Sequence, residues 1–87
     1  MSTKDQAIKN MELTQELAAY IAKHPKVAKK SPKSATYVAF SAKDEKLNEA
    51  NEKLLQSIIK EGRKFIIKAV QTNDKLNPWK FFPVNPI

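Results

Sequence analysis

The chain contains no cysteine and only one glycine, one histidine and one arginine among its 87 residues. Without cysteine there is no disulfide, no thiolate metal site and no cysteine nucleophile. A single glycine excludes the glycine-rich loops that bind dinucleotides and nucleoside triphosphates, because those loops need at least two. The zinc-protease pattern H-E-x-x-H and the serine-hydrolase turn G-x-S-x-G are also absent. We therefore expect no metal, no cofactor and no enzymatic activity.

Long apolar runs are missing as well. No segment approaches the ~18 apolar residues of a membrane span, and the N-terminal residues include no apolar signal segment. We therefore expect a cytoplasmic protein that does not contact a membrane. A chain of 87 residues forms one domain, whose core buries only somewhat more than about 60% of the unfolded surface. Without disulfides, a domain of this size gains stability from close packing or from self-association.

Negative charge is scarce: nine acidic residues face sixteen basic ones, which gives a net charge of +7. Arg63 is the one arginine, so the other fifteen basic residues are lysines. The excess favours contact with an anionic surface such as nucleic acid. Base-specific recognition relies on bidentate arginine, so lysines would contact phosphates instead.

Two apolar stretches separated by a helix-length segment organise the chain. Residues 36–40 are rich in β-branched and aromatic side chains, and residues 64–72 contain an apolar run interrupted only by Lys68. Residues 42–61 have the helical period on one face, at Leu47, Ala50, Leu54, Leu55, Ile58 and Ile59. Ser41 and Asp44 resemble a capping box at its start, and Gly62 suits a left-handed cap at its end. This pattern predicts two parallel strands joined by a helix.

A first helix is predicted over residues 4–23, with its clearest apolar face at Leu13, Leu17, Tyr20 and Ile21. Pro25 should end it, because the residue before a proline is disfavoured in the α region. Residues 24–35 show neither a helical nor a strand period and are predicted to be a basic loop. Ile8 and Met11 project away from the apolar face and need another partner.

The segment around this loop has the highest density of positive charge, with five lysines, two prolines and no acid between residues 23 and 33. One interpretation is a solvated connection, since exposed charges need no further explanation. The other is a phosphate-contacting loop formed by Lys23, Lys26, Lys29, Lys30 and Lys33. No aromatic residue is interleaved with these lysines to stack on a base.

The C-terminal residues 73–87 contain three of the seven aromatic side chains, Trp79, Phe81 and Phe82. Nearby prolines restrict this arm to an edge strand or an extended segment. The aromatic rings carry too much apolar surface to remain in water. Two arrangements remain open: the arm folds back on its own chain, or it docks on a neighbouring subunit.

Three polar residues lie on the predicted apolar faces. Asn51 falls within the face of the second helix, and Asn10 and His24 extend the face of the first. A buried amide needs hydrogen-bond partners, so we expect Asn51 to be paired. It would bond to backbone or fix the register of its helix, and His24 would cap the C-terminal end of its own helix. Alternatively, Asn10, Tyr20, His24 and Asn51 converge on a small-molecule pocket.

The segments NMELTQELAAYIAKHP, SATYVAF and GRKFIIKAV, together with Asp44, Leu47 and Asn51, resemble a small family of uncharacterised prokaryotic proteins that carry a domain of unknown function. In that family an N-x-E-L…H-P helix precedes a β-α-β unit. The similarity covers roughly residues 8–72. Arg63 and Lys64 stand where the family more often has Gly-Lys. The resemblance implies no activity.

The sequence as a whole predicts the α/β class, with a single small α-β-α-β domain. The first helix packs on a parallel β-α-β unit, and the sheet is completed by the C-terminal arm, by a second subunit or by both. The incomplete sheet, Ile8 and Met11, and the aromatic arm favour a non-enzymatic binding or assembly module that works as a homo-oligomer, a dimer or higher. The alternative is a nucleic-acid-associated protein.

Overall fold

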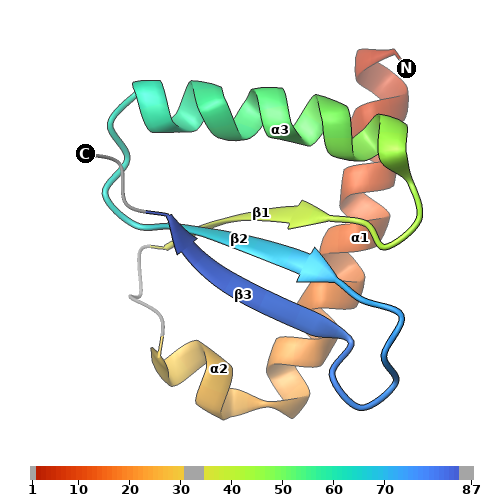
Figure 1. Ribbon diagram of the computed structural model, residues 1–87, viewed down its shortest axis with the longest axis vertical. Helices are drawn as coiled ribbons and strands as arrows, with labels where there is room; N and C mark the ends of the chain where they lie inside the picture. Colours follow the sequence, from red (N-terminus) through yellow and green to blue (C-terminus); the bar gives the residue numbers. More distant parts are fainter. Residues whose placement is uncertain (1, 31–34, 85–87) are drawn as a thin grey trace.

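A computed structural model of the chain describes residues 2–30 and 35–84. Its three strands form one sheet in the order β1-β2-β3. One helix crosses the back of this sheet and another lies along its β1 side (Figure 1). The elements in chain order are α1 (Thr3–Lys23), α2 (Pro25–Lys30), β1 (Thr36–Phe40), α3 (Glu45–Lys60), β2 (Ile66–Gln71) and β3 (Trp79–Val84).

The predicted β-α-β unit is confirmed. β1 and β2 pair in parallel from Thr36 opposite Ile66 to Phe40 opposite Val70, and α3 connects them. The apolar period of α3 directs Leu47, Leu55 and Ile58 into the core. Gly62 follows α3 with a φ of 81°, a left-handed conformation that glycine adopts without a steric penalty.

The C-terminal aromatic segment forms the edge strand β3, which pairs antiparallel with β2 of the same chain. Trp79 is only 6% exposed and joins the core beneath α1, next to Leu13 and Leu17. Of the two arrangements expected for this segment, the described part folds back on its own chain. β2 thereby gains a partner on each side.

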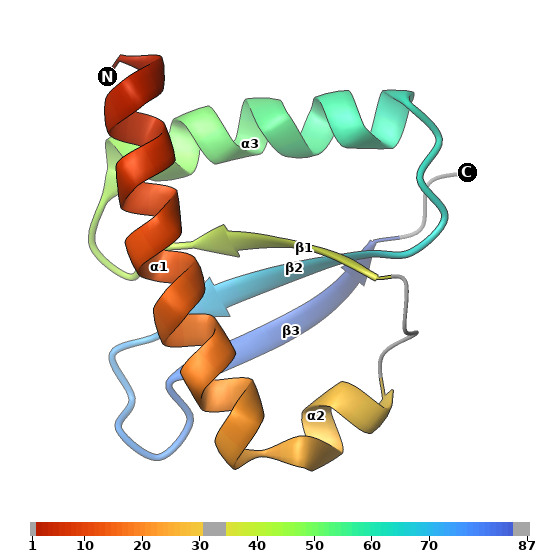
Figure 2. The same ribbon diagram turned by 180° about the vertical axis from the view of Figure 1, so that it is seen from behind.

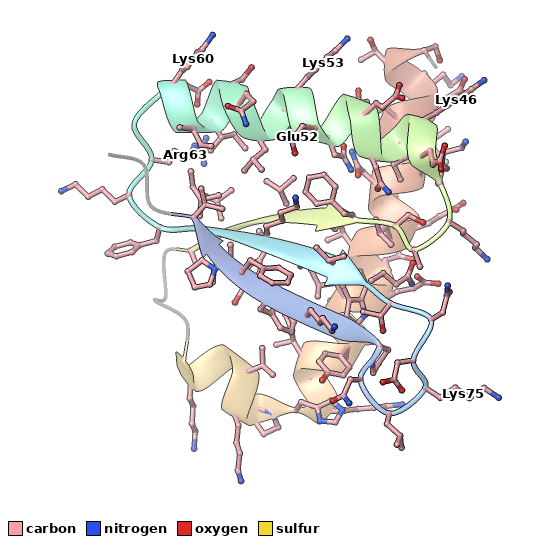
Figure 3. The ribbon with its side chains drawn as sticks, viewed as in Figure 1. Lys46, Glu52, Lys53, Lys60, Arg63 and Lys75 are labelled. Atoms are coloured by element: carbon pink, nitrogen blue, oxygen red, sulfur yellow. The ribbon has the colours of Figure 1, made fainter. Side chains whose placement is uncertain are left out.

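Two clusters of apolar side chains lie on opposite faces of the sheet. On the back, α1 packs across the strands (Figure 2), in a cluster formed by Leu13, Leu17, Ala39, Leu47, Ala69 and Trp79. On the front, α3 covers β1 and the adjacent part of β2, in a cluster formed by Val38, Phe40, Leu55, Ile58 and Ile66. The outer side of α3 is basic, with Lys46, Lys53 and Lys60 pointing away from the sheet (Figure 3). None of the described helices is long and apolar enough to cross a membrane.

The predicted start of the second helix is wrong by three residues. α3 begins at Glu45 with Asp44 as its N-cap, because the Asp44 carboxylate accepts the Leu47 N–H at 3.1 Å. The Ser41 hydroxyl accepts the backbone N–H groups of Lys43 and Asp44, both at 3.2 Å, and so stabilises the turn before the helix. The sequence offers two capping side chains three residues apart, and only the geometry of the turn selects between them.

The prediction of a loop over residues 24–35 is also wrong in part, since Pro25–Lys30 form the short helix α2. Pro25 ends α1 as predicted, but it also opens α2. Proline is favoured at the first helical position because it has no N–H to leave unpaired there and its φ is already helical. The Val27 N–H donates to the His24 carbonyl at 3.0 Å across this junction. Lys33 lies outside the described residues.

Candidate functional site

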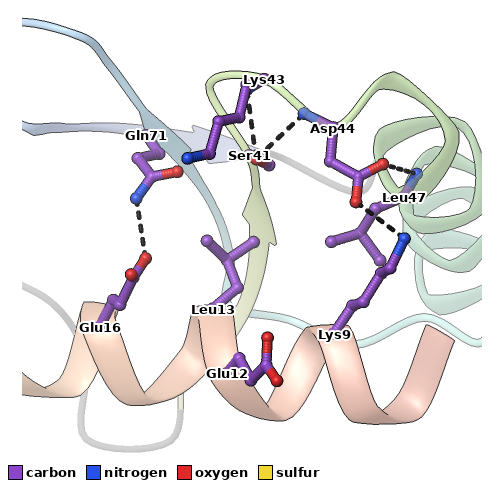
Figure 4. Close-up of a pocket in the computed structure, with 9 residues that line it drawn as sticks. All are labelled: Lys9, Glu12, Leu13, Glu16, Ser41, Lys43, Asp44, Leu47 and Gln71. Atoms are coloured by element: carbon purple, nitrogen blue, oxygen red, sulfur yellow. Dashed lines mark hydrogen bonds and ion pairs between the residues drawn. The ribbon is translucent and has the colours of Figure 1, made fainter. Parts of the chain in front are cut away.

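A polar cleft of about 380 Å³ opens where β1 and β2 end (Figure 4). Ser41 directly follows β1, and Gln71 is the last residue of β2. The carboxyl ends of parallel strands are the usual place for ligands in open α/β sheets. One wall is formed by α1 and the other by the turn before α3; the lining residues are Lys9, Glu12, Leu13, Glu16, Ser41, Lys43, Asp44, Leu47 and Gln71.

Most polar groups of the cleft are paired with one another. Lys9 forms an ion pair with Asp44 at 3.3 Å. The Gln71 amide donates to Glu16 at 2.9 Å and accepts the Ala42 N–H at 3.2 Å, so it joins α1 to the turn. Across residues 2–30 and 35–84, no group of acids and histidine could hold a metal ion. The polar side chains that line the cleft therefore hold α1 against the sheet and the turn before α3.

One feature of the sequence points to this cleft, and it lies at the ends of the predicted strands rather than on the helix faces. Ser41 and Gln71 each mark the carboxyl end of a predicted strand, and such ends meet at one edge of a parallel pair. Lys9, Glu12 and Glu16 recur at spacings of three and four on α1 and form one exposed helical stripe beside that edge.

Replacing Asp44 with asparagine is expected to reduce stability at neutral pH, and this loss should become smaller as the pH falls below 3.8. The Leu47 N–H and the Lys9 ammonium hold the pKa of Asp44 below its ordinary 3.8. A carboxyl whose pKa is lower in the folded chain stabilises the fold above that value, and this contribution disappears as the pH falls through the folded pKa. Urea unfolding of both proteins at pH 7 and at about pH 3 measures the difference. A difference that is equal at both pH values would contradict the assignment.

Asn51 lies at the centre of a network that joins three elements, and it is 1% exposed. Its amide nitrogen donates to the Ala39 carbonyl of β1 at 2.9 Å and to Asn10 of α1 at 2.8 Å. Its amide oxygen accepts from Asn10 at 3.0 Å and from Gln6 at 3.2 Å. Two donors and two acceptor positions are thus all used, which confirms the prediction that Asn51 is paired.

The network also seals the outer edge of β1. The Thr36 N–H bonds Phe65 on the β2 side, so the backbone groups of Ala39 and Ser41, an odd number of residues further on, point away from β2. Asn51 donates to the Ala39 carbonyl. Asn48 accepts the Ser41 N–H at 2.7 Å and donates to the Ser41 carbonyl at 2.8 Å. Two α3 side chains therefore occupy edge groups that another strand could otherwise pair with. Asn48 was missed because it lies at the margin of the apolar face.

The four residues of the predicted small-molecule pocket fall into two pairs. Asn10 and Asn51 are in direct contact, as described. Tyr20 and His24 stack on each other with ring centroids 4.2 Å apart, at the C-terminal end of α1. Fourteen residues separate Asn10 from His24, or about 21 Å along an α-helix. The structure thus brings the members of each pair together and keeps the two pairs apart.

The lysines of the predicted phosphate-contacting loop lie at the junction of α1 and α2. Lys23 is in the last turn of α1, and Lys26 and Lys29 are exposed on α2, one turn apart. Lys30 ends α2. The short helix α2 therefore gives a regular structure to part of the segment that was predicted to be a loop.

The front of the sheet is open over β2 and β3, where none of the described elements lies (Figure 1). The pairing register places Lys68 opposite Phe82 and Val70 opposite Lys80, so these four side chains share that face. Phe82 is 49% exposed, whereas its neighbour Phe81 packs against Tyr20 and Tyr37 on the back. Of the three aromatic residues expected in an oligomer arm, only Phe82 remains on the surface.

These features define a small α/β domain in which a helix seals one sheet edge and half of one sheet face stays open. The chain belongs to the Family of unknown function (DUF5647), which matches residues 5–77. The resemblance expected from the sequence is confirmed at this level; the prokaryotic origin and the particular motif stay predictions. No curated protein and no solved structure matches the chain.

Proposed function

We propose that this protein is a non-enzymatic assembly module that forms a homodimer through the open front face of its sheet. The observation that supports the proposal is Phe82, which is half exposed at the centre of this face between Lys68, Lys80 and the half-buried Val70 and Val84. Phe82 is thus an exposed aromatic ring with two valines and two lysines around it, and aromatic residues are enriched at interfaces relative to the free surface.

The distribution of charged residues on this face supports pairing with a second copy of the chain. Glu45, Glu49 and Glu52 border a hollow beside Phe40 on the α3 side, and Glu52 is visible there in Figure 3. Lys80 lies on β3 at the other side of the face, and the Lys68 ammonium lies between them, over the Phe40 ring at 4.6 Å from its centroid. A dimer interface with two-fold symmetry uses the same patch twice, so it must be complementary to itself. A two-fold axis parallel to the strands brings α3 of each copy over β3 of its partner and pairs acids with lysines.

Replacing Phe82 with glutamate is expected to convert the dimer into a monomer. Wild-type protein should sediment with twice the mass of the 9.9 kDa chain, because burying Phe82 from both copies removes apolar surface at the centre of the interface. The matched control is Phe65→Glu, since Phe65 is 47% exposed and its position in the register of β2 directs it to the opposite face. Sedimentation equilibrium measures all three proteins.

A charge exchange distinguishes this interface from general apolar association. Glu52→Lys and Lys80→Glu should each weaken the dimer, and the double variant should recover much of the loss if the two side chains meet across the axis. A wild-type chain that stays monomeric at the highest concentration measured, or a Phe65→Glu variant as disrupted as Phe82→Glu, would refute the proposal.

A second candidate function is association with nucleic acid through phosphate contacts. It is supported by the exposed Lys23, Lys26 and Lys29, which α1 and α2 bring to one end of the molecule in a chain of net charge +7. Lys30 and Lys33 belong to the same stretch of sequence. Lysines that neutralise phosphates release bound counterions, so such binding weakens steeply as salt increases.

A further inference from the structure

Four aromatic side chains, far apart in sequence, form one row on the back of the molecule. His24 stacks on Tyr20 at 4.2 Å between ring centroids, and Tyr20 stacks on Phe81 of β3 at 6.2 Å. Tyr37 of β1 meets Phe81 edge to face at 6.4 Å. The row is anchored in the core cluster under α1, against which Tyr20, Tyr37 and Phe81 pack. The rings therefore form one continuous row, with His24 tilted by 32° against Tyr20 at its end.

The row ends in solvent at His24. The imidazole is exposed, and among the described residues its one ring contact is Tyr20. Lys23 precedes His24 directly, and Lys26 follows it by two residues at the start of α2. Lys29 lies one helical turn beyond Lys26. The exposed end of an aromatic stack is thus surrounded by lysines on both sides along the chain.

We infer that this end of the molecule binds single-stranded nucleic acid, with a base stacked on His24 and the neighbouring phosphates held by Lys23, Lys26 and Lys29. The inference rests on the second candidate function and specifies its surface and its kind of nucleic acid. Single-strand binding proteins combine a basic track along the backbone with aromatic rings that stack on bases. In the sequence, no aromatic residue is interleaved with these lysines to stack on a base. The fold places the row of aromatic rings beside them.

Stacking selects single strands for a physical reason. In a duplex both faces of each internal base are already covered by neighbouring bases, so a ring can stack only after unpairing, which costs a few kcal/mol. In a single strand each base still has a π-face, and stacking on an aromatic side chain does not depend on the sequence. Lysines cannot add base readout of the arginine type, so we expect little sequence preference.

The test is fluorescence anisotropy with a labelled single strand of about 12 nucleotides and the matching duplex, each at about 50 and 200 mM salt. Wild-type protein should bind the single strand more tightly and lose affinity steeply with salt. His24→Ala should weaken single-strand binding about 5- to 100-fold and leave duplex binding unchanged. His24→Phe, which keeps a ring, should retain the preference. Phe65→Ala, which removes an exposed aromatic ring outside both proposed interfaces, is the control for loss of an aromatic residue elsewhere.

The lysines are tested with two variants of equal charge change. Lys23, Lys26 and Lys29 are replaced together by glutamine in one protein, and Lys46, Lys53 and Lys60 of α3 in the other (Figure 3). The first triple variant should lose binding and the second should retain it. Equal loss in both would mean that net charge alone binds nucleic acid, which would overturn the inference.

The remaining outcomes separate the inference from the function on which it rests. Salt-dependent binding of single strand and duplex with equal affinity, unaffected by His24→Ala, would overturn the stacking site and leave phosphate contact in place. No binding at about 50 mM salt would overturn both. Circular dichroism melting of each variant confirms that the exposed substitutions leave the fold intact.

Discussion

Replacing Asn51 with leucine is expected to lower the free energy of unfolding by about 2–3 kcal/mol. Leucine has the same branching as asparagine and a larger volume, but it can neither donate nor accept a hydrogen bond. The substitution would leave the Ala39 carbonyl unpaired at the β1 edge and would strip Asn10 and Gln6 of their shared partner. A buried polar group left without a partner costs more than the hydrogen bond itself contributes. Urea unfolding followed by circular dichroism measures the loss.

The control for Asn51→Leu is Gln56→Leu on the same helix. Gln56 is exposed and hydrogen-bonds only to Glu52, one turn away, at 3.2 Å. Exposed substitutions of this kind usually change stability by less than about 0.5 kcal/mol. If Asn51→Leu proved as stable as the wild type, or more stable, the amide network would be dispensable and the core would hold α3 by apolar packing alone.

Replacing Trp79 with alanine is expected to lower the free energy of unfolding by about 3–5 kcal/mol. A domain of 87 residues has roughly 4–13 kcal/mol in total. The variant should therefore be unfolded or close to it. Trp79 begins β3 and is buried under Leu13 and Leu17 of α1, so its loss opens a cavity where the helix, β2 and the edge strand meet.

Circular dichroism is the suitable measurement, because Trp79 is the sole tryptophan and the variant loses the fluorescence that would report on folding. Trp79→Phe should retain much of the stability, since a ring still fills the site. Phe65→Ala, at an exposed ring outside the core, should change the melting temperature little. A Trp79→Ala protein that melted with the wild type would show that β3 contributes nothing to the fold.

The position of α3 connects the fold to the proposed assembly. Because Asn48 and Asn51 hold α3 against the edge of β1, the helix covers that side of the front face and does not reach over β3. The same hydrogen bonds that protect one edge of the sheet thereby leave a face open. A sheet whose β1 edge is blocked to strand addition and whose front face is open over β3 is suited to pair through that face.

Much of the fold was predictable because it depends on local patterns. The β-branched and aromatic side chains of residues 36–40, and the three- and four-residue spacings on α1 and α3, are patterns within a few residues of one another. Gly62 was predictable for the same reason, since a left-handed φ at a helix end is a property of one residue. The short helix α2 was missed because six residues are too few for a period to be recognised.

The candidate sites were predictable only in part. The sequence showed that Asn51 lies on a buried face and needs a partner, but not that Asn10, 41 residues earlier, supplies it. It grouped Tyr20 and His24 with Asn10 and Asn51, whereas the fold keeps His24 beside Tyr20 and packs Tyr20 against Phe81, away from Asn51. It placed three aromatic residues in one segment, but the pleat of β3 separates Phe81 on the back from Phe82 on the front.

The sequence by itself determined the two long helices and the parallel strands β1 and β2, since backbone preference and side-chain periodicity act over one or two turns. The tertiary structure alone decided that β3 pairs with β2, that α3 seals the β1 edge and that an aromatic row ends beside the lysines of α2. These contacts depend on how one element is positioned against another. That position is a balance of burial, hydrogen bonding and chain connection over the whole domain, which no local pattern contains.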